Sequence, residues 1–408
     1  MDVMTEQKSL RIGVDLRPVL TGQISGVEQY TISVLGELLA IDPHNTYVLF
    51  YVSYKNQDRH LLDLLARYPA LKSPNVEIRK LKWINWPMLL HGFFKPLNWP
   101  KADVICGGLD AMWMPSPMLL PLSSRCARIT TFHDLIFFLF PQFYTLKSRI
   151  WQWQMDYPYE GRISDAVIAV SKNTKRDLIK LLHTDPGKIQ VIYEGVAEAY
   201  SKTPDEAVFA HLKNKWHLPD TYIYYVGSIE PRKNLVTVVR ALKQLQEEIG
   251  DTIKLVVSGG KSWLENELYQ TIKELGLERQ VIFTGRVEEA EKIALLQHAL
   301  AFVFPSFYEG FGLMVLEAFA AGCPVITSNV ASLPEVAGDA GILVEPTDSH
   351  RIAEAIKKLL QDASWRAELI RRGKVLAKPF SWEATARQTL AAIEQAVREH
   401  GNQQILLR

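Results

Sequence analysis

The chain contains few cysteines and no long hydrophobic run. Its cysteines, Cys106, Cys126 and Cys323, are odd in number and lack the spacing of metal ligands. No stretch reaches the roughly 18 consecutive apolar residues that a membrane-spanning helix needs. The first residues carry no apolar signal segment either. These absences argue against a disulfide framework and a membrane anchor, and we expect a cytoplasmic protein.

An excess of charge of one sign is also missing. The 46 Lys and Arg residues balance 45 Asp and Glu residues, which leaves a formal net charge of +1. Such a chain has no global field that would attract nucleic acid or anionic lipid. We therefore expect no nucleic-acid partner, and any anion must be bound at a local site.

The pattern of elements predicts two α/β domains. At 408 residues, with 48% hydrophobic residues, the chain is too long for one ordinary core. Apolar runs of strand length alternate with helical patterns in both halves, which favours doubly wound parallel sheets. The polar stretch 201–215 separates an N-terminal domain (1–200) from a C-terminal domain (201–380). An amphipathic helix is predicted in the remaining segment, 381–408.

One stretch, residues 305–322, carries the clearest chemical signal. It reads PSFYEGFGLMVLEAFAAG and follows a short apolar strand, 299–304. Gly310 and Gly312 open a segment of good helix formers, so the pattern predicts a strand, a glycine turn and a helix. The first N–H groups of a helix have no partner inside it, and the helix dipole favours an anion there.

Two glutamates accompany this glycine turn. Glu309 precedes it, and Glu317 lies more than a turn inside the predicted helix among apolar neighbours. A carboxylate is seldom buried without a partner. A solvated glutamate on an amphipathic helix is the simpler alternative for Glu317, but the combination with Glu309 and both glycines favours a binding site.

Two adjacent cations lie at another strand end. Arg232 and Lys233 stand directly before a helix predicted to begin near residue 234. Cations at this end of a helix oppose its dipole, so an anion should lie beside them. A diphosphate would serve, and a solvated Arg-Lys pair is the alternative. The strand-end loops 258–260 and 284–287 are expected at the same edge of the sheet.

The N-terminal half offers weaker signals. A glycine loop that ends at Gly26 runs into the first helix, but its glycines do not match the dinucleotide fingerprint. His133 follows the predicted strand 128–132, at the edge where ligands gather in parallel sheets. A histidine with a purely structural role is the equal alternative.

Two aromatic segments stand out in the same half. Residues 82–101 contain three Trp, two Phe and three Lys, and residues 136–153 add Lys147 and Arg149. Trp with Lys is typical of a membrane–water interface, whereas a loop whose rings cover the core is the alternative. We keep peripheral contact with the inner face of the plasma membrane, or with a lipid-linked acceptor, as a hypothesis.

Together these motifs resemble those of the retaining GT-B glycosyltransferases of family 4. The resemblance lies in the glutamate pair Glu309 and Glu317, in GSIEPRKN at 227–234, in LPEVAG at 333–338 and in FSWE at 380–383. It covers nearly the whole chain and is weakest near the first aromatic segment. It implies the GT-B fold, in which two Rossmann-like domains face across a cleft and a C-terminal helix returns to the N-terminal domain.

The resemblance also implies residue roles. Arg232 and Lys233 would neutralise the donor diphosphate. Glu309 would lie against the donor sugar, and Glu317 would accept hydrogen bonds from both ribose hydroxyls. His133 would contact the sugar. The other positions expected to contact the donor are Gly26, Ser228, Arg286, Val287, Gly310, Phe311, Gly312 and Leu313, with Arg286 and Val287 at the base.

Two positions depart from the family pattern. Ser228 stands where many relatives carry arginine, so Arg232 would serve beside Lys233 without that help. Many relatives read Asn-Gly-Val-Asp after the last strand of the N-terminal domain, whereas this chain reads Glu-Gly-Val-Ala at 194–197, so Glu194 replaces the asparagine. A carboxylate at this point would be an acceptor-side base or a sugar contact, or else a surface substitution.

The resemblance predicts retaining transfer of a hexose from a nucleoside diphosphate sugar to a glycan or polyprenyl-lipid-linked acceptor. It is closest to envelope and exopolysaccharide glucosyl- or mannosyltransferases, with UDP-glucose slightly favoured as the donor and GDP-mannose next. No Asp-x-Asp pair is present, so we expect no metal and no cofactor. The alternatives are a GT-B epimerase, a phosphorylase or a non-catalytic subunit; the missing fingerprint disfavours a nicotinamide dehydrogenase.

Overall fold

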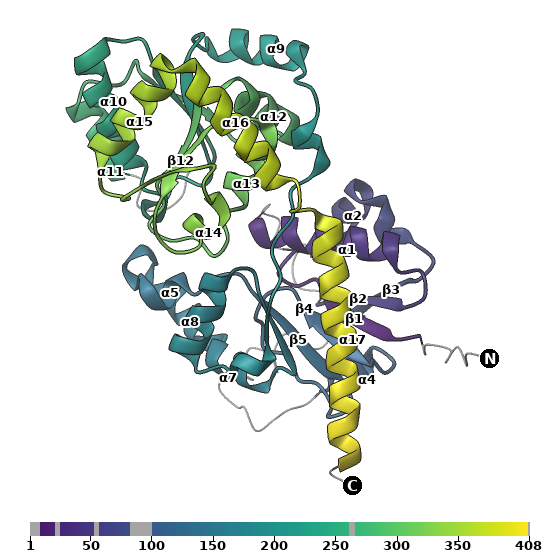
Figure 1. Cartoon of the computed structure of the whole chain (residues 1–408). Coiled ribbons are helices and arrows are strands. Elements are labelled where there is room, and N and C mark those ends of the chain that lie inside the picture. Colours follow the sequence, from purple (N-terminus) through teal and green to yellow (C-terminus); the bar gives the residue numbers. More distant parts are fainter. Residues whose placement is uncertain (1–8, 21–24, 53–56, 82–99, 261–265, 407–408) are drawn as a thin grey trace. The chain divides into compact units, whose positions relative to one another are not determined.

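The computed structural model describes residues 9–20, 25–52, 57–81, 100–260 and 266–406. Packing divides the chain into two compact units, each built around one parallel sheet with helices on its faces (Figure 1). The N-terminal unit comprises Met1–Glu194 and Trp382–Arg408, and the C-terminal unit comprises Gly195–Ser381. The division thus falls a few residues before the residue 200 expected from the sequence.

The sheet of the N-terminal unit is parallel throughout, in the order β3-β2-β1-β4-β5-β6-β7. Its central strands β4, β5 and β6 are buried along their whole length, and β5 buries Arg128, Thr130 and Thr131 among its apolar residues. The strands are β1 (Arg11–Asp15), β2 (Thr46–Val52), β3 (Val76–Leu81), β4 (Ala111–Met114), β5 (Ala127–Phe132), β6 (Ala166–Ala169) and β7 (Ile189–Val191). β4 was not predicted.

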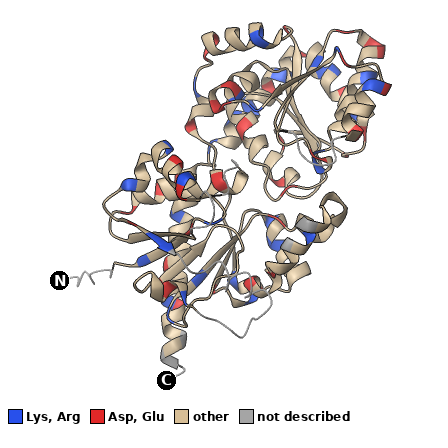
Figure 2. Cartoon of the chain, turned by 180° about the vertical axis from the view of Figure 1, so that it is seen from behind, with Lys and Arg blue, Asp and Glu red and all other residues tan. Residues whose placement is uncertain are grey.

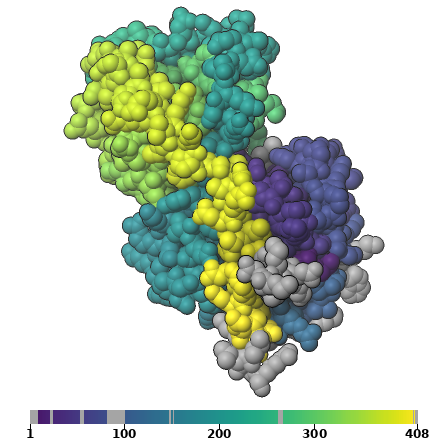
Figure 3. All heavy atoms as spheres, turned by 45° about the vertical axis from the view of Figure 1, so that its right-hand side comes forward, coloured from purple at the N-terminus to yellow at the C-terminus, as the bar shows by residue number. Residues whose placement is uncertain are grey.

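Helices cover this sheet, and the longest comes from the end of the chain. They are α1 (Gly26–Ile41), α2 (Gln57–Arg67), α4 (Ala102–Ile105), α5 (Ile136–Leu139), α6 (Leu146–Gln154), α7 (Tyr157–Ile163), α8 (Lys172–Leu182) and α17 (Trp382–Leu406), with short 3-10 turns at η1 (Pro69–Lys72), η2 (Pro141–Phe143) and η3 (Pro186–Lys188). Ser25 caps α1 by accepting a hydrogen bond from the Glu28 N–H. Helix α17 packs against α1 and β5, and Figure 3 shows it lying along α1.

The C-terminal unit repeats the design with the order β10-β9-β8-β11-β12-β13. Its strands are β8 (Tyr222–Val226), β9 (Lys254–Ser258), β10 (Val281–Gly285), β11 (Ala301–Phe304), β12 (Val325–Ser328) and β13 (Ile342–Val344). The sequence predicts strands at 222–226, 253–258, 281–283, 301–304, 324–327 and 341–344, and the observed bounds agree to within a residue or two.

The connections of this unit are mostly helical. They are η4 (Glu198–Ser201), α9 (Glu206–Trp216), η5 (Pro231–Lys233), α10 (Leu235–Ile249), α11 (Asn266–Glu274), α12 (Glu289–His298), α13 (Leu313–Ala321), α14 (Leu333–Ala337), α15 (Ser349–Gln361) and α16 (Ala363–Ala377). Helix α9 occupies the polar stretch that the sequence suggested as a domain boundary. The hydrophobic periodicity does not reveal this helix, because Leu212 is the one residue of α9 that is buried.

The strand order creates one special position in each sheet. In the C-terminal unit the chain moves outward from β8 to β10 and then returns to β11, on the other side of β8. The loops after β8 and β11 therefore diverge from adjacent strand ends, and open α/β sheets bind ligands at such a switch point. This is where the sequence motifs 227–234 and 305–312 meet.

The surface carries both signs of charge. Lys and Arg are interspersed with Asp and Glu over the helices of each unit (Figure 2), as a net charge of +1 suggests. Within the described ranges, no helix combines the length and the apolar character needed to cross a membrane.

Candidate functional site

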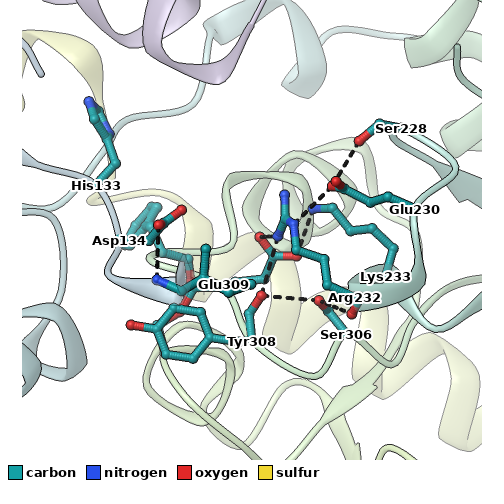
Figure 4. A network of polar contacts seen from close by, with 12 residues as sticks. His133, Asp134, Ser228, Glu230, Arg232, Lys233, Ser306, Tyr308 and Glu309 are labelled. Carbon is teal, nitrogen blue, oxygen red and sulfur yellow. Dashed lines mark hydrogen bonds and ion pairs between the residues drawn. The ribbon is translucent and has the colours of Figure 1, made fainter. Parts of the chain in front are cut away.

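The loops after β8 and β11 bring Arg232, Lys233 and Glu309 together (Figure 4). Arg232 Nη1 donates to Glu309 Oε2 at 3.0 Å, and Lys233 Nζ donates to Oε1 at 2.6 Å. Lys233 is 4% exposed and Glu309 is 9% exposed. The Lys233 ammonium also lies 4.6 Å from the centre of the Phe304 ring. These residues therefore form a buried ion cluster rather than a solvated Arg-Lys pair.

Glu309 is ionised in this cluster. Burial by itself would raise the pKa of its carboxyl, but the charges of Arg232 and Lys233 lower the pKa to about 2. Burial and the neighbouring Arg232 charge lower the pKa of Lys233. The anion that the two cations require is thus supplied, in part, by the chain itself.

A second glutamate holds the other side of Arg232. Glu230 Oε1 lies 2.8 Å from Arg232 Nε, and the Ser228 hydroxyl donates to the same oxygen at 3.0 Å. The guanidinium therefore lies between the carboxylates of Glu230 and Glu309, and these two contacts fix the orientation of its plane. Ser228, which replaces the arginine of many relatives, joins this network through Glu230 and stays exposed.

Asn234 fixes the backbone that carries the two cations. It has the left-handed conformation (φ 59°) between η5 and α10, which asparagine tolerates better than most residues. Its side-chain N–H groups donate to Pro305 O at 3.0 Å and Pro346 O at 2.6 Å. It thereby ties the β8 loop to the β11 loop. The sequence does not predict this role, and the Asn234 side chain makes no capping hydrogen bond to α10.

The glycine turn leads directly into α13, as predicted. Gly312 precedes the helix with φ 110°, and a Cβ there would lie 2.9 Å from Leu333 Cδ2, so both conformation and space favour glycine. No side chain caps this helix start. Gly310, Phe311 and Gly312 are buried, whereas Leu313 is only half-buried. The first turn of α13 therefore lies close to the surface at the switch point.

Glu317 has a partner that the sequence did not reveal. It is 1% exposed, and its two carboxylate oxygens accept hydrogen bonds from Lys292 Nζ at 3.2 and 3.1 Å. Lys292 lies on α12, where it follows Glu289 and Glu291 in a pattern typical of an exposed helix. No local signal separates it from a solvated lysine.

Arg286 and Val287 follow β10 at the same edge of the sheet. Arg286 is exposed and Val287 is half-buried. A Cβ at Gly260 would lie 2.9 Å from Arg286 Nε, so the loops after β9 and β10 touch at the edge of the sheet where the sequence predicts both. Ser258 and Thr284 join them through a 2.8 Å hydrogen bond between their hydroxyls.

In the N-terminal unit the structure brings His133 and Glu194 together. His133 Nδ1 lies 3.3 Å from Glu194 Oε1, and Nε2 lies 2.8 Å from Pro115 O. The Tyr30 ring packs edge-on against the imidazole, with ring centres 4.8 Å apart. Glu194 is 8% exposed, so the surface-substitution alternative is wrong. Gly26, the first residue of α1, is exposed with open space around its Cα.

Among the described residues, no group of three or more His, Cys, Asp or Glu is arranged to hold a metal ion. The sugar, phosphate, ribose and base contacts assigned to the residues above stay predictions.

An exposed apolar face lies on α5 and α6. Leu146, Ile150 and Trp153 of α6 are 71%, 51% and 72% exposed, and their spacing places them on one side of the helix. Beside them lies an open cavity of about 420 Å³ lined by aromatic side chains, Arg149 and Gln152. The first aromatic segment (82–101) lies outside the described residues except for its last two positions.

Two family models match the chain, one in each half. The model described as "Glycosyltransferase Family 4" matches residues 24–200, and "Glycosyl transferases group 1" matches residues 209–376. O-antigen chain mannosyltransferase B of Escherichia coli is 34% identical over 266 residues, which are 65% of this chain and 69% of that protein. The serotype-specific mannosyltransferase WbdA of E. coli is 32% identical over 257 residues, but the match spans only 32% of its length.

Solved structures share the fold. HepE of Anabaena, in complex with UDP and glucose, superposes with a TM-score of 0.71 at 18% identity, covering 95% of this chain and 100% of HepE. WaaG, a glycosyltransferase involved in lipopolysaccharide biosynthesis, superposes with a TM-score of 0.68 at 16% identity, covering 94% of this chain and 99% of WaaG. These likenesses establish the GT-B fold. With both family models and a relative at 34% identity, the chain belongs to the family-4 glycosyltransferases.

Proposed function

We propose that this glycosyltransferase moves a hexose from a nucleoside diphosphate sugar to a glycan or lipid-linked acceptor in polysaccharide biosynthesis, with retention of the anomeric configuration. The observation that carries the proposal is the buried cluster of Arg232, Lys233 and Glu309 at the switch point of the C-terminal sheet. It adjoins the start of α13, where the helix dipole favours an anion.

The cluster suits a donor diphosphate because Arg232 and Lys233 already offset the negative charge of Glu309, the carboxylate beside the proposed site. An isolated Glu309 carboxylate would repel a diphosphate, whereas here Arg232 and Lys233 neutralise it. The guanidinium and ammonium are also held in place before any ligand arrives. Charges that are prearranged in this way stabilise a transition state without the cost of reorganisation.

The proposed reaction separates charge. The bond between the sugar C1 and the donor phosphate oxygen breaks, and an acceptor hydroxyl oxygen forms the new bond to C1 on the same face. The leaving phosphate takes the proton of the acceptor hydroxyl. Arg232, Lys233 and the start of α13 stabilise the departing diphosphate, and Glu309 lies against the sugar as positive charge develops on it.

We propose GDP-mannose as the donor. The family resemblance slightly favoured UDP-glucose, but O-antigen chain mannosyltransferase B, at 34% identity, supports a mannosyl donor. UDP-glucose remains the second candidate. HepE in complex with UDP and glucose is too distant, at 18% identity, to bear on this choice.

A donor panel tests the proposal. Purified protein is incubated with GDP-mannose, UDP-glucose and their free nucleotides, with an oligomannose acceptor and EDTA, and the product is examined by NMR. We expect release of GDP and an α-linked product in the presence of EDTA. An inverted anomer would overturn retention, and loss of activity in EDTA would overturn metal independence. Donor conversion without free nucleotide would indicate an epimerase, and a phosphate requirement would indicate a phosphorylase.

We further propose that the α5–α6 face contacts an anionic membrane that presents a lipid-linked acceptor. Exposed Leu146, Ile150 and Trp153 would enter the interface while Arg149 meets lipid phosphate. Co-sedimentation with phosphatidylglycerol vesicles should fall when all three apolar residues become serine. Val375→Ser, which changes an equally exposed residue of α16, is the matched control and should bind as the wild type does. Equal sedimentation of both variants would exclude this face.

A further inference from the structure

Lys292 lies between two carboxylates in the interior of the C-terminal unit. Its ammonium contacts both oxygens of Glu317, at 3.2 and 3.1 Å, and Glu289 Oε2 at 3.1 Å. The Lys292 side chain is 12% exposed and the Glu317 side chain 2% exposed, whereas Glu289 is 55% exposed. Lys292 is therefore a buried cation that joins a deep carboxylate to a surface one.

Tyr200 of η4 covers this group. Its hydroxyl donates to Glu289 Oε1, and its ring centre lies 5.1 Å from Lys292 Nζ. Tyr200 is fully buried. Burial, followed by the charges of Glu317 and Glu289, raises the pKa of the phenol, so Tyr200 acts as a neutral donor. The aromatic face and the hydroxyl together hold Lys292 and Glu289 in place.

The charge state of Glu317 depends on this lysine. Burial would lower the pKa of Lys292, but the negative charges of Glu317 and Glu289 raise it. The lysine therefore stays protonated, and a buried ionised carboxylate needs such a partner. Without Lys292, Glu317 would become neutral or turn away from its present position.

We propose that Lys292 is the positioning residue that makes Glu317 selective for a ribonucleoside diphosphate. The inference rests on the proposed function, in which Glu317 accepts hydrogen bonds from the ribose hydroxyls. Lys292 Nζ contacts both oxygens of this carboxylate, at 3.2 and 3.1 Å, and so fixes its orientation. Lys292 keeps the carboxylate ionised and correctly turned, and a neutral carboxyl would accept from hydroxyls more weakly.

The test compares nucleotides that differ only in a ribose hydroxyl. Calorimetric titration measures GDP, 2′-deoxy-GDP and 3′-deoxy-GDP against the wild type and Lys292→Met, and the same three forms of UDP as a second series. Because a hydrogen bond to a charged group is strong, we expect the wild type to prefer the ribonucleotide by about tenfold or more. In Lys292→Met the preference should fall to less than about threefold.

Control variants separate positioning from stability. Lys292→Arg keeps the cation and should retain most of the preference. Lys215→Gln removes the more exposed contact, 3.2 Å long, between Lys215 of α9 and Glu291 of α12, and should leave the preference unchanged. In the double variant Lys292→Met with Glu317→Gln, both members of the buried ion pair are neutral, so neither leaves an unpaired charge behind. It should melt at a higher temperature than Lys292→Met and still lack the preference.

The outcomes distinguish this inference from the proposed function. A wild type that binds neither nucleotide series overturns both. Tight binding of GDP or UDP with no ribose preference overturns only the inference, because donor binding would then stand without Glu317. A Lys292→Met protein that melts earlier but keeps the full preference shows a purely structural lysine, and that result also overturns the inference.

Discussion

Glu194 Oε1 lies 3.3 Å from Nδ1 of His133, while Nε2 of the same ring lies 2.8 Å from the carbonyl oxygen of Pro115. Both ring nitrogens thus face oxygen atoms that accept hydrogen bonds. A neutral imidazole carries one N–H and can satisfy only one of them. The carbonyl oxygen of Pro115 can only accept, so Nε2 carries an N–H, and Glu194 is the partner of the opposite ring nitrogen.

This pair predicts that Glu194 orients the imidazole of His133. Glu194→Ala removes the contact to Nδ1 and should lower the free energy of unfolding by about 1–3 kcal/mol, because the ring nitrogen loses its partner. Glu194→Gln keeps a polar side chain within reach of Nδ1 and should retain most of that stability. Denaturant unfolding measures both variants, and a Glu194→Ala protein as stable as the wild type would contradict this role.

Arg232→Ala should lower turnover more than donor affinity. In the proposed reaction the guanidinium meets the departing diphosphate, whose charge peaks in the transition state. We expect kcat to fall about 100-fold, with a smaller change in KM for the donor. Glu317→Ala, the comparison variant, should chiefly raise KM. Steady-state kinetics with the preferred donor measure both parameters, and equal effects of the two substitutions on kcat and KM would refute this division.

The Glu309 ion cluster should make the C-terminal unit sensitive to acid. The pKa of Glu309 is lowered from 4.5 to about 2. Its contribution to stability is therefore complete above pH 4.5 and is lost as the pH falls towards 2, a change of about 3 kcal/mol. Denaturation of Glu309→Gln should lack this dependence. Glu267→Gln, which alters an exposed carboxylate of α11, should keep the wild-type profile.

Asn234 allows conformation to be separated from hydrogen bonding. Both Asn234→Gly and Asn234→Ala remove the two hydrogen bonds to Pro305 and Pro346, a loss of about 1–3 kcal/mol. Alanine must also adopt the left-handed conformation, so it should destabilise by about 1 kcal/mol more than glycine. Denaturant unfolding of the two variants measures this difference. Equal stability would show that the backbone relaxes when the side chain is removed.

Docking of α17 should weaken at alkaline pH. His400 Nδ1 lies 2.9 Å from Asp165 Oδ1, and Nε2 lies 2.8 Å from Ser124 O. Burial lowers the pKa of His400, but Asp165 and the Ser124 carbonyl raise it above its usual value. The stabilisation is complete below about pH 6.5 and is lost as the pH rises through the folded-state pKa. The melting temperature of His400→Gln should therefore fall below that of the wild type at pH 5.5 and approach it at pH 8.5.

Elements with a strong local pattern were predictable. β8, β11 and α13 have apolar runs, glycines or helix formers at the right spacing, so their bounds agree closely with the sequence. β4 and α9 were missed for physical reasons. β4 has four residues, and such a short strand gives no periodic signal. α9 buries one residue, Leu212, so its sequence shows no apolar face.

The candidate site divides in the same way. The residues with local signatures, Arg232, Lys233, Glu309 and Glu317, could be named from the sequence. Their partners could not. Glu230 and Lys292 resemble the many solvated charges of the chain, and only the packing of neighbouring elements shows that they are paired with Arg232 and Glu317.

The sequence by itself determined the α/β class, the strand–glycine turn–helix unit at 305–322 and the family, because these depend on spacing over a few residues. The tertiary structure decided which charges neutralise each other. Arg232 and Glu309 are 77 residues apart and meet only because β8 and β11 are neighbours in the sheet. Electrostatic interaction depends on distance and burial, which strand order sets and local sequence does not.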